Sequence, residues 1–187
     1  MPGKRGTSVS GDGRPIRRSI RLPGYDYSGA GAYYVTICVH RKECLLGEVV
    51  SGVMHLNHLG RIADRHWVSL SVRFPSIALD RHCVMPNHLH GTLLLKCSSA
   101  ARGNQDGAPP LGKVIAYFKY RSTKQINAMR GTPSRRFWQR NYYEHIIRSE
   151  EELDRIRKYI VENPLKWDSD PDNPRSRKKP SDEPWAQ

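Results

Sequence analysis

The sequence predicts an α+β fold, in which helices pack on one face of an antiparallel sheet. Two observations predict it. Segments rich in β-branched and aromatic residues alternate with segments of helical spacing, and two predicted strands follow each other closely enough to pair antiparallel. The 187 residues suffice for one hydrophobic core with tails. We expect a flexible basic arm over residues 1–30, a folded domain over 31–167 and a disordered tail over 168–187, from the composition of both ends.

The folded domain begins with predicted strands and a helix. Residues 32–39 (AYYVTICV) are β-branched and aromatic, which is typical of a strand. Residues 44–54 hold short apolar runs around two glycines, which indicates a hairpin or a strand with a turn. Residues 57–72 carry apolar side chains at helical spacing, with Asn57 as a candidate N-cap.

Two further strands and a helix follow. Residues 77–85 and 88–96 are predicted strands joined through a Pro-Asn pair, which favours an antiparallel arrangement. Residues 97–110 are a low-complexity loop, long for a connection inside a compact domain. Apolar residues at helical spacing predict a helix over 111–129.

The last part of the domain combines an ambiguous segment with a clear helix. Residues 137–147 (FWQRNYYEHII) are aromatic, and their pattern is ambiguous as to secondary structure. Residues 149–162 form a predicted helix, opened by a capping box of Ser149 and Glu152. Pro164 disfavours helical geometry at the residue before it, so we expect the helix to end there.

Charge and cysteine content narrow the class of protein. The formal net charge of +13 favours a polyanionic partner, above all nucleic acid, with a solvated basic surface as the alternative. No apolar run approaches the length of a membrane span, and the N-terminus lacks an apolar signal segment, so we expect neither membrane association nor secretion. The scattered cysteines form no CxxC pair, which argues against a structural zinc site and favours a reducing cytoplasm.

His88 and His90 are the first candidates for chemistry. On a strand, residues i and i+2 point to the same face, so the two imidazoles would project side by side. That spacing suits two ligands of one divalent metal ion, although two surface histidines produce the same pattern. With a third polar group, such a pair would leave coordination positions open for phosphate oxygens.

Tyr159 and Asn163 are the second candidates. They lie one helical turn apart on the same face, which flanks the apolar stripe of the predicted helix. Tyr159 would therefore stand at the boundary between helix and sheet. There it is either a core tyrosine or a reactive phenol.

A third feature is the interleaving of aromatic and basic side chains over residues 135–148. This pattern suits stacking on unpaired bases and contact with phosphates, and a buried aromatic cluster is its alternative. A basic face on the preceding helix adds candidates, for which a solvated surface is the alternative. The candidate nucleic-acid-binding residues are Arg135, Arg136, Trp138, Arg140, Arg148, Lys113, Lys119 and Arg121.

Three motifs together resemble a known family: MPNHLH at 85–90, FWQRNYYEHIIR at 137–148 and YIVENP at 159–164. With these motifs in this order, the chain resembles the REP-associated tyrosine transposases over residues 33–167. Those proteins are relatives of the single-tyrosine transposases in the HUH (His-hydrophobic-His) endonuclease superfamily. The resemblance implies a ferredoxin-like or RRM-like sheet whose central strand carries the histidine pair.

The resemblance also implies a reaction. His88, His90 and Asn163 would bind Mg²⁺ or Mn²⁺, and Tyr159 would attack a phosphodiester of single-stranded DNA. The product would be a 5′-phosphotyrosine link and a free 3′-OH, formed beside hairpins of repeated extragenic palindromes.

Three alternatives stay open at this point. Tyr142 and Tyr143 are rival nucleophiles, because they lie between the histidines and Tyr159 in the sequence. The competing function is a non-catalytic regulator that binds hairpin DNA or RNA on the same fold. The chain would act as a monomer or as a homodimer.

Overall fold

The computed structural model describes residues 31–96 and 109–176 of the chain. The predicted arm over 1–30, the loop residues 97–108 and the end of the predicted tail lie outside the described residues. Within the described ranges, no helix is both long enough and apolar enough to span a bilayer.

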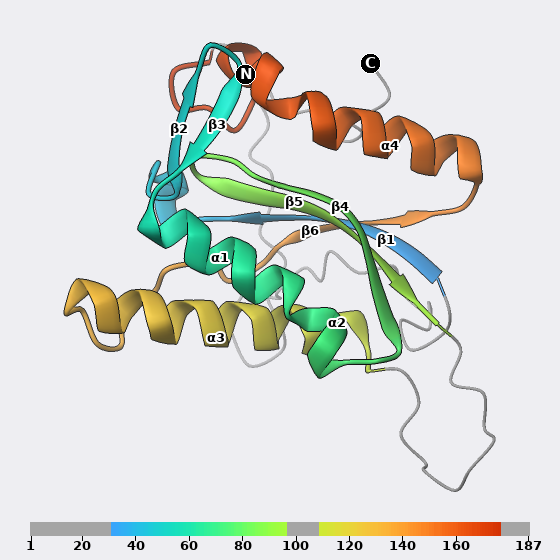
Figure 1. Ribbon diagram of the computed structural model, residues 1–187, viewed down its shortest axis with the longest axis horizontal. Helices are drawn as coiled ribbons and strands as arrows, with labels where there is room; N and C mark the ends of the chain where they lie inside the picture. The colour runs from blue at the N-terminus through green and yellow to red at the C-terminus, as the bar shows by residue number, and fades with distance from the viewer. Residues whose placement is uncertain (1–30, 97–108, 177–187) are drawn as a thin grey trace, which may run out of the picture.

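A four-stranded antiparallel sheet forms the centre of the molecule (Figure 1). Its strand order is β4-β5-β1-β6. The bounds are Ile77–Val84 for β4, His88–Leu95 for β5, Gly31–Cys38 for β1 and Tyr143–Ile147 for β6. With one helical connection before β4 and another before β6, the main chain follows the βαββαβ order of a ferredoxin-like fold. The expected fold class is therefore confirmed, and β5, which carries the histidine pair, is a central strand.

A separate two-stranded hairpin, β2 (Gly47–Val50) and β3 (Val53–Leu56), overlaps the predicted segment 44–54 and extends two residues past it. The short helix η1 (His40–Lys42) connects β1 to this hairpin. The ambiguous aromatic segment forms β6, which pairs with β1 at the edge of the sheet, and an isolated bridge between Val39 and Trp138.

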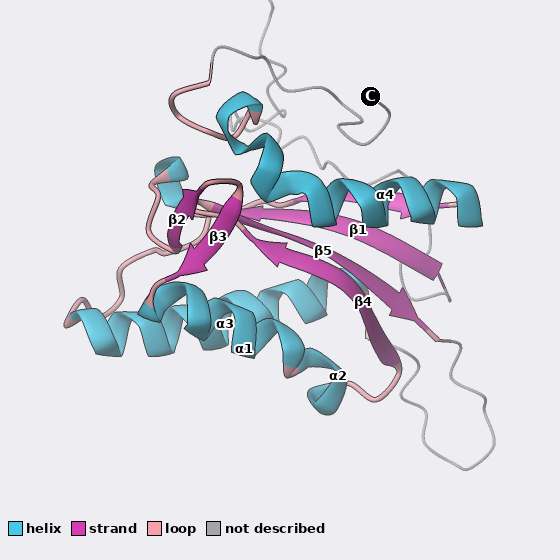
Figure 2. Cartoon of the chain, turned by 45° about the horizontal axis from the view of Figure 1, so that its top comes forward, coloured by secondary structure: helices cyan, strands magenta, loops and turns pink. Residues whose placement is uncertain are grey.

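Helices cover both faces of the sheet rather than one (Figures 1 and 2). On one face lie α1 (His58–Val68), α2 (Leu70–Arg73) and α3 (Leu111–Arg130), and on the other lies α4 (Glu150–Glu162). The expectation of one covered face is thus wrong for α4.

The reason for the second covered face is that β1 is apolar on both of its sides. Tyr33, Val35 and Ile37 enter the core beneath α1 and α3, whereas Tyr34 joins Ile156 and other α4 residues in a second cluster. Alternating side chains on a strand point to opposite faces, so this run requires two covering layers.

The caps predicted for two helices are confirmed. The Asn57 side chain accepts hydrogen bonds from the backbone N–H groups of Leu59 and Gly60, 2.9 and 3.0 Å away, at the start of α1. Ser149 Oγ accepts from Glu152 N at 3.2 Å at the start of α4. The capping box is modified, because the Glu152 carboxylate accepts from Arg148 N instead of reaching the N–H of Ser149.

The chain beyond α4 differs from the prediction. Asn163 keeps helical dihedrals (φ −57°, ψ −42°) despite the following proline, and the 3-10 helix η2 (Asn163–Ser169) continues the turn. The folded part also extends past residue 167, because Asp170 and Asn173 are buried. Asn173 Nδ2 donates to Trp167 O at 2.9 Å, and the Lys42 ammonium pairs with Asp172. Residues 168–176 thus pack near η1, at the end of the central strand β1, although the sequence predicted disorder for them.

Candidate functional site

His88 and His90 lie side by side on the face of β5 that α4 covers. Both side chains are buried, while Leu89 between them enters the opposite core. Their Nε2 atoms are 2.8 Å apart and their ring centroids 4.3 Å apart. The i, i+2 prediction is therefore correct, and the alternative of two surface histidines is excluded.

Asn87 fixes the tautomer of His88. Its Nδ2 donates to the backbone oxygens of Lys42 and Asp172, at 3.1 and 2.7 Å, so its Oδ1 must face the imidazole. That Oδ1 lies 2.7 Å from His88 Nδ1 and can only accept. Nδ1 therefore carries the proton, and the Nε2 atom of neutral His88 presents a lone pair.

Two hydroxyl groups surround the other nitrogen of His90. Tyr34 Oη lies 2.7 Å and Thr36 Oγ1 2.9 Å from His90 Nδ1, and the Thr36 hydroxyl donates to Tyr34 Oη at 3.0 Å. The threonine proton is used in this way, and the Tyr34 hydroxyl can either donate to His90 Nδ1 or accept from it. When Nδ1 of His90 carries the proton, its Nε2 lone pair faces Nε2 of His88, and both imidazoles direct ligand atoms at one place.

Burial makes this pair suitable for a cation. Burial lowers the pKa of His88, and burial together with the neighbouring His88 lowers the pKa of His90 well below its usual value. Neutral imidazoles are the form that binds metal ions. Two lone pairs that face each other repel, whereas a cation placed between them would be attracted to both.

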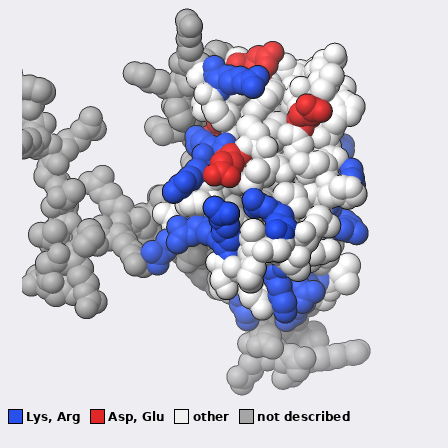
Figure 3. All heavy atoms as spheres, turned by 90° about the vertical axis from the view of Figure 1, so that its left-hand side faces the viewer, with Lys and Arg blue, Asp and Glu red and all other residues white. Residues whose placement is uncertain are grey.

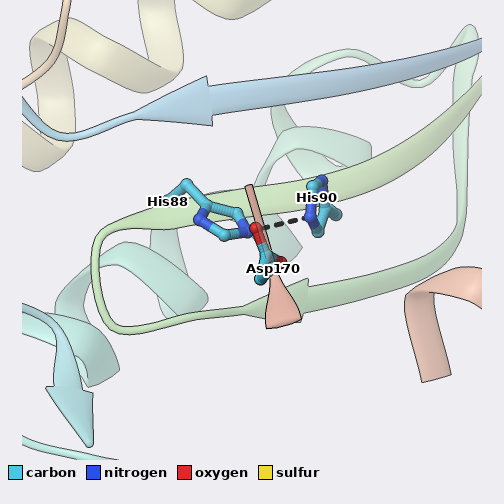
Figure 4. A group of neighbouring side chains, drawn as sticks. All are labelled: His88, His90 and Asp170. Carbon is cyan, nitrogen blue, oxygen red and sulfur yellow. Dashed lines mark hydrogen bonds between the residues drawn. The ribbon is translucent and has the colours of Figure 1, made fainter. Parts of the chain in front are cut away.

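Asp170 completes a group of three possible ligands. One ligand atom from each of His88, His90 and Asp170 lies within 4.8 Å of the others. Figure 4 shows the three side chains gathered at this place. Burial raises the pKa of the Asp170 carboxyl, and the neighbouring His88 counteracts this effect. Its Oδ1 accepts from Asp172 N at 2.6 Å, and it forms no ion pair with a Lys or Arg in the described ranges. A divalent cation would compensate a buried carboxylate beside two neutral histidines.

Sequence reasoning missed Asp170, because it lies in the segment assigned to the tail. One signal was present: Asp168, Asp170 and Asp172 follow the last helix in a chain that is otherwise strongly basic. The three-residue cluster can bind a metal ion, as expected for the histidine pair.

Asn163, the predicted third ligand, lies beside this cluster. It is buried, and its Oδ1 atom has no hydrogen-bond partner within the described residues. Its side chain hydrogen bonds to Tyr159 and to Asp170, which counteracts the rise in pKa that burial causes in both groups. Asn163 therefore joins the candidate nucleophile to the carboxylate, and its amide oxygen is left available to a cation.

Tyr159 stands next to His90. The two ring centroids are 5.3 Å apart, and the Tyr34 ring lies 6.3 Å from Tyr159. The side chain is half-buried, and burial raises its pKa well above the usual value, against the hydrogen bonds from Asn163 and Tyr34. The phenol is neutral at physiological pH without further help, and a cation at the histidine pair would favour its ionised form.

The rival tyrosines occupy other places. Tyr142 packs against the core beneath α3, with the Lys119 ammonium 5.2 Å from its ring centroid. Tyr143 is 37% exposed, and its ring contact is with Tyr34 at 6.2 Å rather than with a histidine of the pair. Of the three candidates, Tyr159 is the one whose ring contacts His90.

Two of the candidate DNA-binding residues have structural roles instead. Trp138 is buried, and its indole N–H donates to Ser122 Oγ at 2.8 Å, so it belongs to the core. Lys119 is half-buried and donates to the backbone oxygens of Gln139, Arg140 and Asn141, at 3.0, 3.4 and 3.0 Å. Lys119 therefore ties α3 to the segment before β6.

The other candidates remain exposed. These are Arg135, Arg136, Arg140, Arg148, Lys113 and Arg121. Figure 3 shows the end of the molecule where α3 ends, with Lys and Arg side chains gathered there and fewer acidic ones.

Comparison with known proteins agrees with this architecture. No family model matches the sequence. An uncharacterized protein from Haemophilus influenzae is 38% identical over 166 residues, which span 82% of this chain and 91% of the relative. A solved structure of a REP-associated tyrosine transposase bound to a REP hairpin superimposes with a TM-score of 0.53 at 19% identity, over 80% of this chain and 74% of that one.

Proposed function

Since the chain belongs to the same family as the Haemophilus influenzae protein and has the fold of a REP-associated tyrosine transposase, we propose that it is a transposase-type, DNA-processing enzyme. In detail, we propose a metal-dependent endonuclease and strand transferase that acts on single-stranded DNA at hairpins of repeated palindromes. The solved relative in fold is itself bound to a REP hairpin. The net charge of +13 is consistent with such a partner.

One observation carries the proposal: Tyr159 and the His88–His90–Asp170 cluster meet at one buried place. A phenol is a poor nucleophile when protonated, and this one is harder to ionise than usual because it is half-buried. A divalent cation, Mg²⁺ or Mn²⁺, bound there would favour the phenolate and withdraw charge from the scissile phosphate. Asn163 and Tyr34 assist by hydrogen bonding to the Tyr159 oxygen.

The reaction is a transesterification. The Tyr159 hydroxyl loses its proton, and its oxygen forms a bond to phosphorus. The bond from phosphorus to the 3′ oxygen breaks, and that oxygen takes up a proton and leaves as a 3′-OH. The number of phosphate ester bonds is unchanged, so a 3′-OH can reverse the step and join strands without an energy source.

One chain supplies every group of this site. Tyr159 on α4 contacts His90 of the same chain, which supports a monomer acting in cis. A homodimer that exchanged its α4 helices would place the tyrosine of one chain beside the histidines of the other.

A covalent-capture assay tests the proposal. The purified protein is mixed with single-stranded hairpin oligonucleotides taken from repeats that flank its gene, with Mn²⁺ or with a chelator. A denaturing gel reports any protein–DNA adduct, and peptide mass spectrometry locates it. We expect a metal-dependent adduct on Tyr159 that is absent from Tyr159→Phe and present in the matched variant Tyr143→Phe.

The other outcomes contradict the proposal in distinct ways. An adduct on Tyr142 or Tyr143 would retain the enzyme and refute the nucleophile. Tight hairpin binding without any adduct would favour the non-catalytic regulator.

A further inference from the structure

A groove and a cleft lie side by side at the C-terminal end of α3, on the side of the sheet opposite to α4. The groove, of about 790 Å³, runs between the second half of α3 and residues 131–140. The cleft, of about 370 Å³, lies between η1 and the same segment. Arg136 and Phe137 line both hollows, so the two form one continuous surface. The proposed mechanism uses none of it.

Arginine side chains dominate the cleft. Arg41, Arg130, Arg135 and Arg136 line it, and the one carboxylate among the lining residues is that of Glu43. Within residues 31–96 and 109–176, none of these four guanidinium groups forms an ion pair. Several unpaired guanidinium groups around one hollow suit a phosphate, which they can contact with paired N–H groups.

The groove beside it is apolar with a cationic edge. Phe137 and Ala128 are among its lining residues, and Lys124 and Arg140 lie along it. Tyr120 of α3 also lines it and is 63% exposed. An exposed aromatic ring next to an apolar groove and flanked by cations is a platform on which an unpaired base can stack.

The backbone around this surface is unusual. Arg41 in the cleft and Ser134 in the groove adopt left-handed conformations, with φ of 59° and 63°. Non-glycine residues adopt this region at an energetic cost, and such residues collect where a precise shape is needed.

We propose that this surface binds one unpaired nucleotide of the DNA strand outside the catalytic pocket. Its phosphate lies in the arginine cleft, and its base lies in the groove against Tyr120. The inference rests on the proposed function, because it takes single-stranded DNA as the substrate. The η1 segment connects the arginine cleft to the catalytic pocket. Arg41 lines the cleft, while the neighbouring Lys42 pairs with Asp172, two residues from Asp170. A DNA strand bound here is therefore anchored by the same η1 segment that contacts the chain next to Asp170 of the His88–His90–Asp170 cluster.

Equilibrium binding separates the contribution of the base from that of the phosphate. We would use the full chain carrying Tyr159→Phe, so that no cleavage interferes, and measure fluorescence anisotropy. The probes are a labelled oligothymidylate and an abasic oligonucleotide of equal length. Tyr120→Ala should weaken binding of the thymidylate about tenfold and leave the abasic probe unaffected, because stacking needs a base. Arg135→Gln with Arg136→Gln should weaken both probes about tenfold and flatten the dependence on salt.

Matched variants control for general effects. Arg65→Gln removes an exposed arginine on α1, and Val72→Ala shortens a side chain that is 83% exposed on α2. Neither should change binding of either probe. An equal loss of both probes with Tyr120→Ala, or unchanged binding with the arginine pair replaced, would overturn the proposal. If Tyr159 forms no adduct while these binding differences persist, the proposed reaction fails and the nucleotide site stands.

Discussion

Replacing Tyr34 by phenylalanine tests how this chain prepares Tyr159 for attack. The Tyr34 hydroxyl lies 2.7 Å from His90 Nδ1 and also hydrogen bonds to Tyr159. Burial raises the pKa of the Tyr159 phenol, and this hydrogen bond counteracts part of the rise. The substitution removes one oxygen from a fully buried ring and leaves the packing in place. A hydrogen bond to a charged group contributes about 1.5–3 kcal/mol. If this bond strengthens as Tyr159 becomes a phenolate, its loss should slow attack by about 10- to 150-fold.

The assay measures adduct formation and metal binding on the same protein. Single-turnover formation of the phosphotyrosine adduct gives the rate, and calorimetric titration with Mn²⁺ gives the affinity. We expect the rate of adduct formation to fall while the Mn²⁺ affinity changes by less than about threefold. The reason is that Thr36 Oγ1, 2.9 Å from His90 Nδ1, can still accept the proton of that nitrogen and so leave Nε2 free for the metal ion.

Tyr33→Phe is the matched control. Tyr33 is the neighbour of Tyr34 on β1, is equally buried and faces the opposite core, so its loss should alter stability without altering the rate. The reasoning is refuted if Tyr34→Phe forms the adduct at the wild-type rate. It is also refuted if Mn²⁺ affinity falls by more than about tenfold in this single variant, since the threonine would then not be an adequate partner.

Three further predictions follow from the same contacts. Adding Thr36→Val to Tyr34→Phe leaves the buried Nδ1–H of His90 without a partner, and Mn²⁺ affinity should then fall about 10- to 100-fold, as calorimetry can show. Asp170→Asn removes a buried charge, so it should raise the melting temperature in chelator and shrink the increase that Mn²⁺ produces in wild type, which thermal unfolding measures. Burial lowers the pKa of Lys119 to about 8, so the unfolded chain binds more protons between that pH and the usual lysine range. Stability should therefore rise with pH across that interval in wild type relative to Lys119→Met, and urea unfolding at pH 7 and pH 10 would show a constant difference if the reasoning is wrong.

Local signals predicted most of the fold. The Asn57 and Ser149 caps depend on residues within one turn, and the structure confirms both. The i, i+2 placement of the histidine pair follows from strand geometry alone, because the pleat sets the direction of each side chain. These features need no information from distant parts of the chain.

The errors arose where distant segments decide the outcome. Residues 168–176 are polar and rich in Asp and Pro, which indicates disorder, yet their order depends on Lys42 and Asn87 from elsewhere in the chain. Asp170 was missed for that reason. Trp138 looked like a stacking residue because its neighbours are basic, but Ser122 on α3 gives its indole a buried partner.

The role of Tyr34 was also beyond local reasoning. In the sequence it is one of two adjacent tyrosines in an apolar strand, and nothing there distinguishes Tyr33 from Tyr34. The register of β1 on β5 makes the difference, because Thr36 pairs opposite His90 and Tyr34 lies on the same face. Pairing register is a long-range property that strand propensity does not contain.

That register explains why the chemistry gathers at one end of the sheet. Cys38, the last residue of β1, pairs with His88, the first of β5, so η1 leaves the sheet beside the His88–His90–Asp170 cluster. From this corner the chain presents Lys42 to Asp172 on one side and Arg41 to the arginine cleft on the other. A bound strand that spans the corner would be held by its phosphate on one side and cut on the other. The ends of strands β1 and β5 would then set the distance between the anchored phosphate and the cleaved one. A change in η1 should therefore shift the position of the cut in the DNA more than it changes the rate of cleavage.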